Sequence, residues 1–356
     1  MPHLVKAPAD VKLDGLSRIG QLSISWRFDL VDAVTGYRRA IHPIISGNAV
    51  IRHDTRSTIK RVITGLTLDQ DDTAAFSSIT SRLEPFMLVG GHEFQVGRYV
   101  PSDWARLRLT SGVMSNASFY DEGFIIDQQL PNAFGANSTG GEVVSSMLER
   151  FLSTYPISYY IEGVLPQYSS LGSWSAGTRG GFVLDQLALD GDYLSPWFDN
   201  SSVLRVKRLA DDELPTFDFD HGSRVIRDRI IESDNLIDAP NRFIVVGNGA
   251  AAMPEEVVGI ADVPSSAPHS IANRGFIVAD VRNRQVTTSA QAGAIAANLV
   301  RNQTLVELTE LETPPDPRHD SYDIINWRGE HWVEISWTLP FAAGAVMSHT
   351  LQRSYT

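Results

Sequence analysis

The sequence of 356 residues contains no cysteine and no long apolar run. Without cysteine, a disulfide framework and a thiolate metal site are both excluded. No apolar stretch approaches the roughly 20 residues that a helix needs to cross a bilayer. The opening residues, MPHLVKAPAD, also lack the apolar core of a signal peptide. These absences predict a soluble chain without a membrane span, made inside a cell.

Positive charge is also scarce, since 30 Lys and Arg face 42 Asp and Glu and the net charge is -12. Proteins that hold nucleic acid cluster Lys and Arg against the phosphates. The short basic run formed by Arg205, Lys207 and Arg208 is interpreted as a solvated strand face. The sequence therefore predicts no stable binding of nucleic acid.

The residues that are present indicate a globular protein with many short strands. Hydrophobic residues make up 43% of the chain and charged residues 20%, a balance typical of a folded domain. In SISWRFDLVD (23–32), apolar and polar residues alternate, which predicts a strand with one buried face. TAAFSSITSRLEPF (73–86) is interpreted as one short helix that stops near Pro85.

The middle third changes to a helical pattern. STGGEVVSSMLERFLSTYP (138–156) has a capping-box spacing at Thr139 and Glu142, followed by apolar residues at helical intervals. A second helix is expected within 178–193, with Asp190-Gly191 as its stop. The stretch WFDNSSVLRVKRL is interpreted as a hairpin around a turn at 199–202.

The last third returns to strands. The residues 242–246 and the alternating HWVEISWTLPF (331–341) predict two of them. Between them, TTSAQAGAIAANLVRNQ (287–303) predicts one helix with an apolar stripe that includes Ala292, Ile295 and Leu299. The order is therefore a β-rich segment, a mixed middle and a second β-rich segment.

One motif suggests a nucleotide site. After the strand at 242–246, Gly247, Gly249 and Ala252 match G-x-G-x-x-A. A dinucleotide fold needs a helix to begin there, because the pyrophosphate binds at the helix N-terminus. The residues that follow are broken by Pro254, Gly259 and two further prolines. The pattern therefore favours a strand with a long loop, and we expect no nucleotide to bind.

The remaining chemistry-bearing residues form no catalytic or ligand motif. The nine histidines are scattered and none fits H-x3-H or H-E-x-x-H. Asp69, Asp71 and Asp72 lack the rest of a calcium loop, and Asp218 and Asp220 are interpreted as solvated carboxylates. GSWSAGTRGG is not a nucleophile elbow. We therefore predict no catalytic, cofactor-binding or metal residue and no cofactor, while a metal site assembled in space stays open.

The order of segments resembles the tail hub proteins of long-tailed bacteriophages, the family that includes baseplate hubs and tail-tip minor tail proteins. Four stretches carry this resemblance: RLEPFMLVGGHEFQVGRYVP (82–101), TRGGFVLDQLALDGDYLSPWFDNSSVLRV (178–206), SDNLIDAPNRFIVVGNG (233–249) and HWVEISWTLPFAAGAVMSHTLQRSYT (331–356). They resemble, in turn, a strand-loop-strand, a helix with a hairpin, the strand that opens a second barrel and the strands that close it.

The resemblance implies a mainly β fold with an α+β middle. Its domains would be a first β-barrel at 1–130, a mixed domain at 131–240 and a similar second β-barrel at 241–356. It implies a structural protein and not an enzyme: a homotrimeric ring at the virion tail tip, made in the host cytoplasm. The ring would join the six-fold tail tube to the three-fold tip and pass the genome during ejection, through a channel expected to be acidic. Implied partners are further copies of the chain, distal tail or tube proteins, the tape-measure protein and tip fibre or spike proteins.

A different class of function stays open beside this one. A β-rich protein with exposed aromatic residues can bind or cleave cell-wall glycan, since tryptophans stack on sugars. The tryptophans available for this are Trp174, Trp197, Trp327 and Trp332. The alternative interpretation places them in cores or interfaces.

Overall fold

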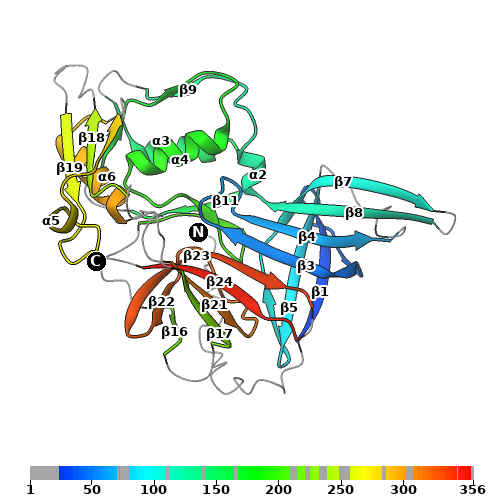
Figure 1. Cartoon of the computed structure of the whole chain (residues 1–356). Coiled ribbons are helices and arrows are strands. Elements are labelled where there is room, and N and C mark those ends of the chain that lie inside the picture. Colours follow the sequence, from blue (N-terminus) through cyan, green and yellow to red (C-terminus); the bar gives the residue numbers. More distant parts are fainter. Residues whose placement is uncertain are drawn as a thin grey trace.

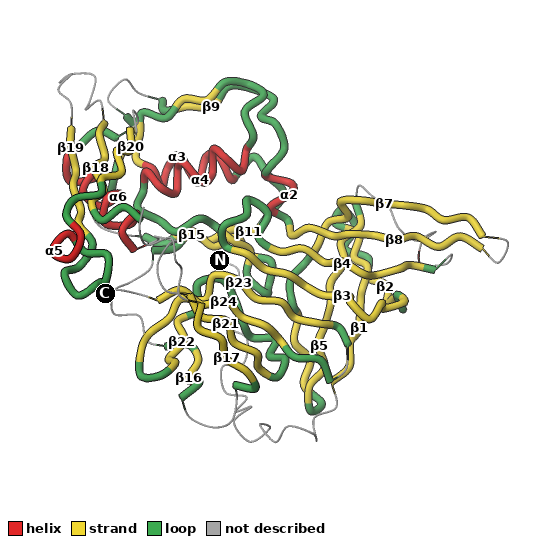
Figure 2. The backbone as a smooth tube through the Cα atoms, in the orientation of Figure 1, coloured by secondary structure: helices red, strands yellow, loops and turns green. Residues whose placement is uncertain are grey.

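The fold of the chain is given by a computed structural model, drawn in Figures 1 and 2. The residues it describes are 24–69, 72, 80–109, 112–137, 141–163, 167–208, 215–220, 225–231, 239–247, 257–282, 286–301, 308–342 and 344–353. Strands dominate, and three groups of elements lie side by side: a large sheet, a mixed middle region and a small α/β unit (Figure 1).

The large sheet has fourteen strands, drawn from both ends of the chain. Its first eight are β1 (Ile24–Asp32), β2 (Arg38–Ile41), β3 (Ile44–Asp54), β4 (Arg61–Leu68), β5 (Ser81–Val89), β6 (His92–Gln95), β7 (Tyr99–Leu109) and β8 (Gly112–Asp121). The others are β16 (Phe217–Asp218), β17 (Arg227–Ile231), β21 (Leu308–Thr313), β22 (Ile324–Trp327), β23 (Glu330–Pro340) and β24 (Met347–Arg353). The two sets join where β23 pairs antiparallel with β3, so that Trp337 lies opposite His53.

Strand β23 confirms the predicted strand at 331–341 and adds one irregularity. Its register against β24 shifts between Glu334 and Ser336, as at a β-bulge. Beyond the shift, Trp337 packs into the core of the first strand set, whereas Trp332 packs into a smaller core around β16 and β22. A bulge changes which side chains face each side of a strand. Glu334 is consequently buried, although it lies among the polar positions of the alternating pattern.

The helix expected at 73–86 is wrong over its second half. Residues 81–89 form strand β5, which pairs along its whole length with β1 and places Pro85 opposite Phe28. Nearly every side chain of β5 is buried. A strand covered on both faces has no alternation to separate it from a helix, and proline in this stretch suggested a helix stop. Residues 73–79 lie outside the described part of the chain.

The middle region confirms both expected helices and the hairpin. Its helices are α2 (Gly123–Ile126), α3 (Val144–Leu152) and α4 (Gly180–Asp190), and the stripes predicted on α3 and α4 are buried. Its strands are β9 (Phe134–Gly135), β10 (Glu142–Val143), β11 (Ser158–Ile161), β12 (Ser169–Ser170), β13 (Ser173–Trp174), β14 (Trp197–Phe198) and β15 (Val203–Val206). The expected capping box is wrong for Glu142, which lies in β10 and pairs with Arg150, while Thr139 is outside the described residues.

The third group of elements is a small α/β unit. It contains β18 (Arg242–Gly247), β19 (Val257–Asp262), β20 (Val278–Arg282), α5 (Ile271–Arg274) and α6 (Ser289–Arg301). Strand β18 lies between β19 and β20, and the apolar stripe of α6 covers this sheet, as predicted for the helix. Strand β18 belongs to a sheet separate from β21 to β24, and α6 packs against its buried face. It therefore does not open a second barrel.

The mainly β fold with an α+β middle is confirmed, whereas two similar closed barrels are not. In the described part of the chain, the strands of the large sheet follow an open path from β17 to β2. Strand pairing also places β16 and β17 with the last strands of the chain. The division into domains at 130 and 240 stays a prediction.

No helix in the described residues is both long and apolar enough to span a membrane.

A matched pair of glycine substitutions tests the packing of α6 on its sheet. A Cβ on Gly259 of β19 would lie 2.1 Å from the backbone of Ala292 and Gly293, whereas a Cβ on Gly293 would meet nothing within 4 Å. We expect Gly259→Ala to destabilise by about 1–3 kcal/mol through overpacking. Gly293→Ala should stabilise by up to about 1 kcal/mol through helix propensity. Urea unfolding of both variants checks the signs, and equal effects would contradict this packing.

Candidate functional site

The most unusual feature of the fold is a buried polar junction where β3, β4, the middle region and the segment 314–323 meet. At its centre, the Arg61 side chain is 1% exposed. Its guanidinium donates to Asn200 Oδ1 and to Asp320 Oδ1, each at 2.6 Å, and lies 5.3 Å from the ring centre of Trp337. One cation thus ties together three parts of the chain that are distant in sequence.

Lys60, the residue before Arg61, is a second buried cation that contacts distant parts of the chain. Its ammonium donates to the carbonyls of Thr55 and Ser57 and to Ser195 Oγ, which donates in turn to Asp185 Oδ1 at 2.6 Å. Burial lowers the pKa of Lys60, and the charge of Asp185 opposes this shift. A cavity of about 20 Å³ beside these groups has room for about one water. The arrangement holds elements in place and offers no space there for a substrate.

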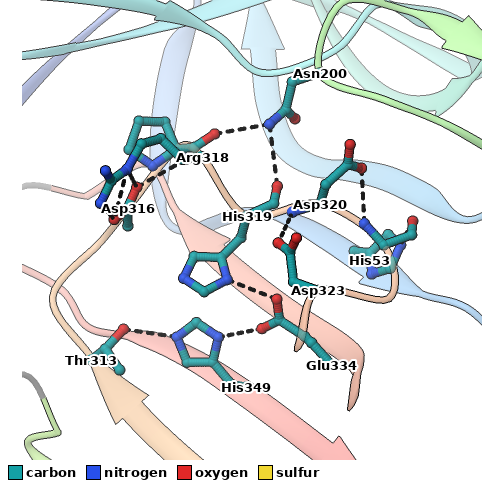
Figure 3. A network of polar contacts seen from close by, with 12 residues as sticks. His53, Asn200, Thr313, Asp316, Arg318, His319, Asp320, Asp323, Glu334 and His349 are labelled. Carbon is teal, nitrogen blue, oxygen red and sulfur yellow. Dashed lines mark hydrogen bonds and ion pairs between the residues drawn. The ribbon is translucent and has the colours of Figure 1, made fainter. Parts of the chain in front are cut away.

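A second part of the junction is the cluster of His319, Glu334 and His349, called here the His–Glu–His cluster (Figure 3). Nδ1 of His319 lies 2.7 Å from Glu334 Oε2, and Nδ1 of His349 contacts Glu334 Oε1. The three side chains are 0–2% exposed. The ring of Phe217 stacks on His319, with centroids 4.0 Å apart. This stacking covers one face of the His319 ring.

The cluster is electrostatically asymmetric. Burial raises the pKa of Glu334, but the two histidines outweigh it and bring that pKa down to about 2. Burial lowers the pKa of His319, yet the charge of Glu334 outweighs it and raises that pKa to about 9. The pKa of His349 is lowered by burial and by the charge of His319. At neutral pH the cluster thus holds one imidazolium, one carboxylate and one neutral imidazole.

His53 gives the junction a measurable pH dependence. It is 2% exposed, its Nε2 lies 2.6 Å from Ser321 Oγ, and its pKa is lowered well below 6.5 by burial and by Arg61. The unfolded chain therefore takes up the proton first. The stability that a neutral His53 contributes is present above pH 6.5 and is lost as the pH falls below it.

Replacing His53 by Gln should remove this dependence. We expect the difference in unfolding free energy between wild type and variant to shrink by about 1 kcal/mol from pH 7.5 to 5.5, since one pKa unit corresponds to about 1.4 kcal/mol. Urea unfolding at both pH values measures it. A difference that stays constant with pH would show that His53 does not titrate as the structure requires.

Two residues that the sequence brought forward, Gly247 and Asp220, lie outside the junction and have structural roles. Gly247 ends β18, and the next element in the described residues is the antiparallel strand β19, while Gly249 and Ala252 lie outside the described residues. Asp220 accepts from the backbone N–H of Arg328 and Gly329 and so closes the turn before β23. That no nucleotide binds stays a prediction.

Two arginines of the basic run are ion-paired, and three of the four tryptophans are buried. Arg205 pairs with Asp199, and Arg208 pairs with Asp192, so this run does not form an open basic patch. Of the four tryptophans considered for sugar stacking, Trp174, Trp197 and Trp332 are 3–6% exposed. Buried rings cannot stack on a glycan, and these three belong to the interior.

Sequence reasoning missed the junction entirely. His53 and Ser321 are 268 positions apart, and Arg61 and Asp320 are 259 apart. No local spacing signals such contacts. The available signal was a single charged residue, Glu334, inside the strongly alternating strand at 331–341.

Three solved structures match nearly the whole chain. A tail protein from Neisseria meningitidis MC58 has 11% identity and a TM-score of 0.62, covering 92% of this chain and 97% of its own. The 43 kDa tail protein of prophage MuSo2 from Shewanella oneidensis has 14% identity and 0.59, covering 92% and 98%. The prophage tail protein gp18 from Listeria monocytogenes EGD-e has 9% identity and 0.58, covering 93% and 95%.

No protein-family model and no curated protein sequence matches the chain. The three structural matches each cover at least 92% of the chain, and all three are described as tail proteins. The chain therefore has the fold of phage and prophage tail proteins, which confirms the expected resemblance at the level of the fold.

Proposed function

We propose that the chain is a structural hub protein of a bacteriophage tail tip and acts by assembly, not catalysis. The observation that carries this proposal is the fold shared with three tail proteins over at least 92% of the chain. The sheet built from both ends of the chain, joined by β23 and β3, supplies two sets of strands that a ring could use as its two barrel-like halves.

In this proposal three copies form a ring between the six-fold tube and the three-fold tip. Exposed apolar side chains support it, because they gather at two separate places: Val258, Ile260, Phe276 and Val278 at β19 and β20, and Val34, Tyr37, Ile44 and Ile45 at β1 to β3. The strands that carry them, β19 and β20 in one case and β1 to β3 in the other, lie far apart in the molecule (Figure 2). Different patches that lie far apart suit a head-to-tail contact, which closes into a ring when the rotation fits.

The ring would contact distal tail or tube proteins, the tape-measure protein and the tip fibre or spike. It would let the genome slide through an acidic channel, since each Lys or Arg contact with phosphate would add affinity and drag. The net charge of -12 per chain supports a lining that repels DNA. Tight duplex binding by the assembled ring near physiological salt would contradict this part of the proposal.

Oligomer mass tests the proposal. We expect the purified chain to reach a mass three times that of its 39.2 kDa monomer, measured by light scattering over a range of concentrations. Ile260→Asp, on the exposed face of β19, should shift the assembly towards monomer. Phe182→Ser serves as the matched control, because Phe182 is similarly exposed, at 52%, but lies on α4. A wild-type chain that stays monomeric, or binds cell-wall glycan saturably, would favour the alternative class of function.

A further inference from the structure

The His–Glu–His cluster has the donor set of a metal site. Each of its three residues offers one ligand atom, and these atoms all lie within 4.8 Å of one another. Two imidazole nitrogens and one carboxylate oxygen are ligands that Zn²⁺ takes at about 2.0–2.2 Å. Ligands at that radius are separated by about 3.3 Å in a tetrahedral site. The 2.7 Å contact between His319 and Glu334 would therefore open by a fraction of an ångström.

The Thr313 hydroxyl is shared between two neighbours beyond the cluster. Its oxygen lies 3.0 Å from the Pro314 carbonyl and 2.7 Å from Nε2 of His349. When its hydrogen goes to Pro314, Nε2 of His349 donates to the Thr313 oxygen, and a neutral ring then carries no hydrogen at Nδ1. In this tautomer the Nδ1 lone pair is free to bind a cation beside Glu334 Oε1 (Figure 3).

A divalent ion held by two neutral imidazoles and one carboxylate gives the cluster one net positive charge. Two imidazolium rings, with centroids 4.6 Å apart, would reach the same net charge around one buried carboxylate. The metal does so without the repulsion between two charged rings at low dielectric.

The surroundings of the cluster also suit a metal ion. A ligating histidine commonly donates its other ring N–H to a fixed acceptor, and Thr313 provides that acceptor for His349. The rings of Phe217 and Phe219 pack against the two histidines. The three ligands come from the segment before β22, from β23 and from β24. One ion would therefore fasten three elements of the C-terminal strand set.

We propose that His319, Glu334 and His349 bind one divalent transition-metal ion of the zinc class through Nδ1 of both histidines and a carboxylate oxygen of Glu334. The ion has a structural role, and its binding free energy adds to the free energy of folding, as it does for metals in small buried sites. This site does not depend on the proposed tail function.

Cobalt provides the direct test. The full chain is unfolded in chelator, dialysed and refolded with Co²⁺, because the buried site must be filled as the chain folds. We expect one Co²⁺ per chain and visible bands of a four- or five-coordinate ion, which Zn²⁺ displaces. Zn²⁺ should also raise the thermal midpoint of the wild-type chain.

Two variants and one control locate the ion. Glu334→Gln keeps the shape of the side chain and His349→Gln keeps a polar group, and each should weaken metal binding by at least about tenfold, since even residues behind the ligands are worth that much. His331→Gln removes an exposed histidine of β23 and should leave binding unchanged. If a variant does not refold, the stoichiometry and bands of the wild-type chain decide alone. Two results would overturn the site: a folded wild-type chain that takes up no Co²⁺, or Co²⁺ binding that only His331→Gln removes. A proton, and not a metal ion, would then lie between the histidines and Glu334.

Discussion

Arg61→Met is expected to lose up to about 3–5 kcal/mol of unfolding free energy, because it leaves Asp320, whose side chain is 27% exposed, without its buried counter-charge. The Arg61 guanidinium contacts both Asn200 and Asp320, and both of these acceptors would lose their donor. Methionine fills a similar volume, so the loss reports on polar contacts and not on a cavity. Urea unfolding at pH 7.5 measures it.

A double-mutant cycle separates the ion pair from the rest of the Arg61 side chain. Burial raises the pKa of Asp320 to about 6, so this carboxyl is charged at pH 7.5 and needs its partner. The double variant Arg61→Met, Asp320→Asn should therefore lose less unfolding free energy than the two single variants lose in sum. Strict additivity would mean that the guanidinium does not act through Asp320.

Glu334→Leu is expected to cost a similar 3–5 kcal/mol or so when metal is removed by chelator. Both oxygens of Glu334 face histidine Nδ1 atoms, and the side chain is fully buried. Leucine would leave His319 without its counter-charge, and the pKa of His319, now near 9, should fall below its ordinary value. Unfolding in urea gives the energy, and the NMR titration of the His319 ring gives the pKa.

Glu330→Leu is the matched control on the same strand. Glu330 pairs with Arg353, but its side chain is 40% exposed. Exposed ion pairs contribute about 0–1 kcal/mol, so this variant should remain close to wild type. Equal losses at Glu330 and Glu334 would show that substitutions anywhere in β23 disturb the sheet, and that the buried cluster has no special role.

Local patterns predicted those parts of the fold that one strand or one helix determines alone. The alternation at 331–341 predicted β23, and the helical stripes predicted α3, α4 and α6. The same reasoning failed at β5, because a strand buried on both faces carries no alternation. The buried position of Glu334 was not predicted either, because a β-bulge is not visible as a change in residue type.

The arrangement of these elements could not be read from the sequence. The pairing of β23 with β3 closes a separation of more than 250 residues, and the junction around Arg61 exists only because of that pairing. The strand at 242–247 was assigned to a barrel by resemblance, yet its partner helix α6 lies some 45 residues downstream and defines a separate unit. Which strands pair, and which sheet a helix covers, depends on how whole faces of sheets and helices pack together. The spacing of residues within one segment does not determine this.

Labelling of intact particles tests the tail-tip hub most directly. Virions produced from the genome that encodes this chain would be incubated with a gold-conjugated antibody against it and viewed by negative-stain electron microscopy. The account predicts gold at the end of the tail that lies away from the head, in a single cluster per particle. Label along the whole tube, label at the head, or particles that carry none of this chain would contradict it.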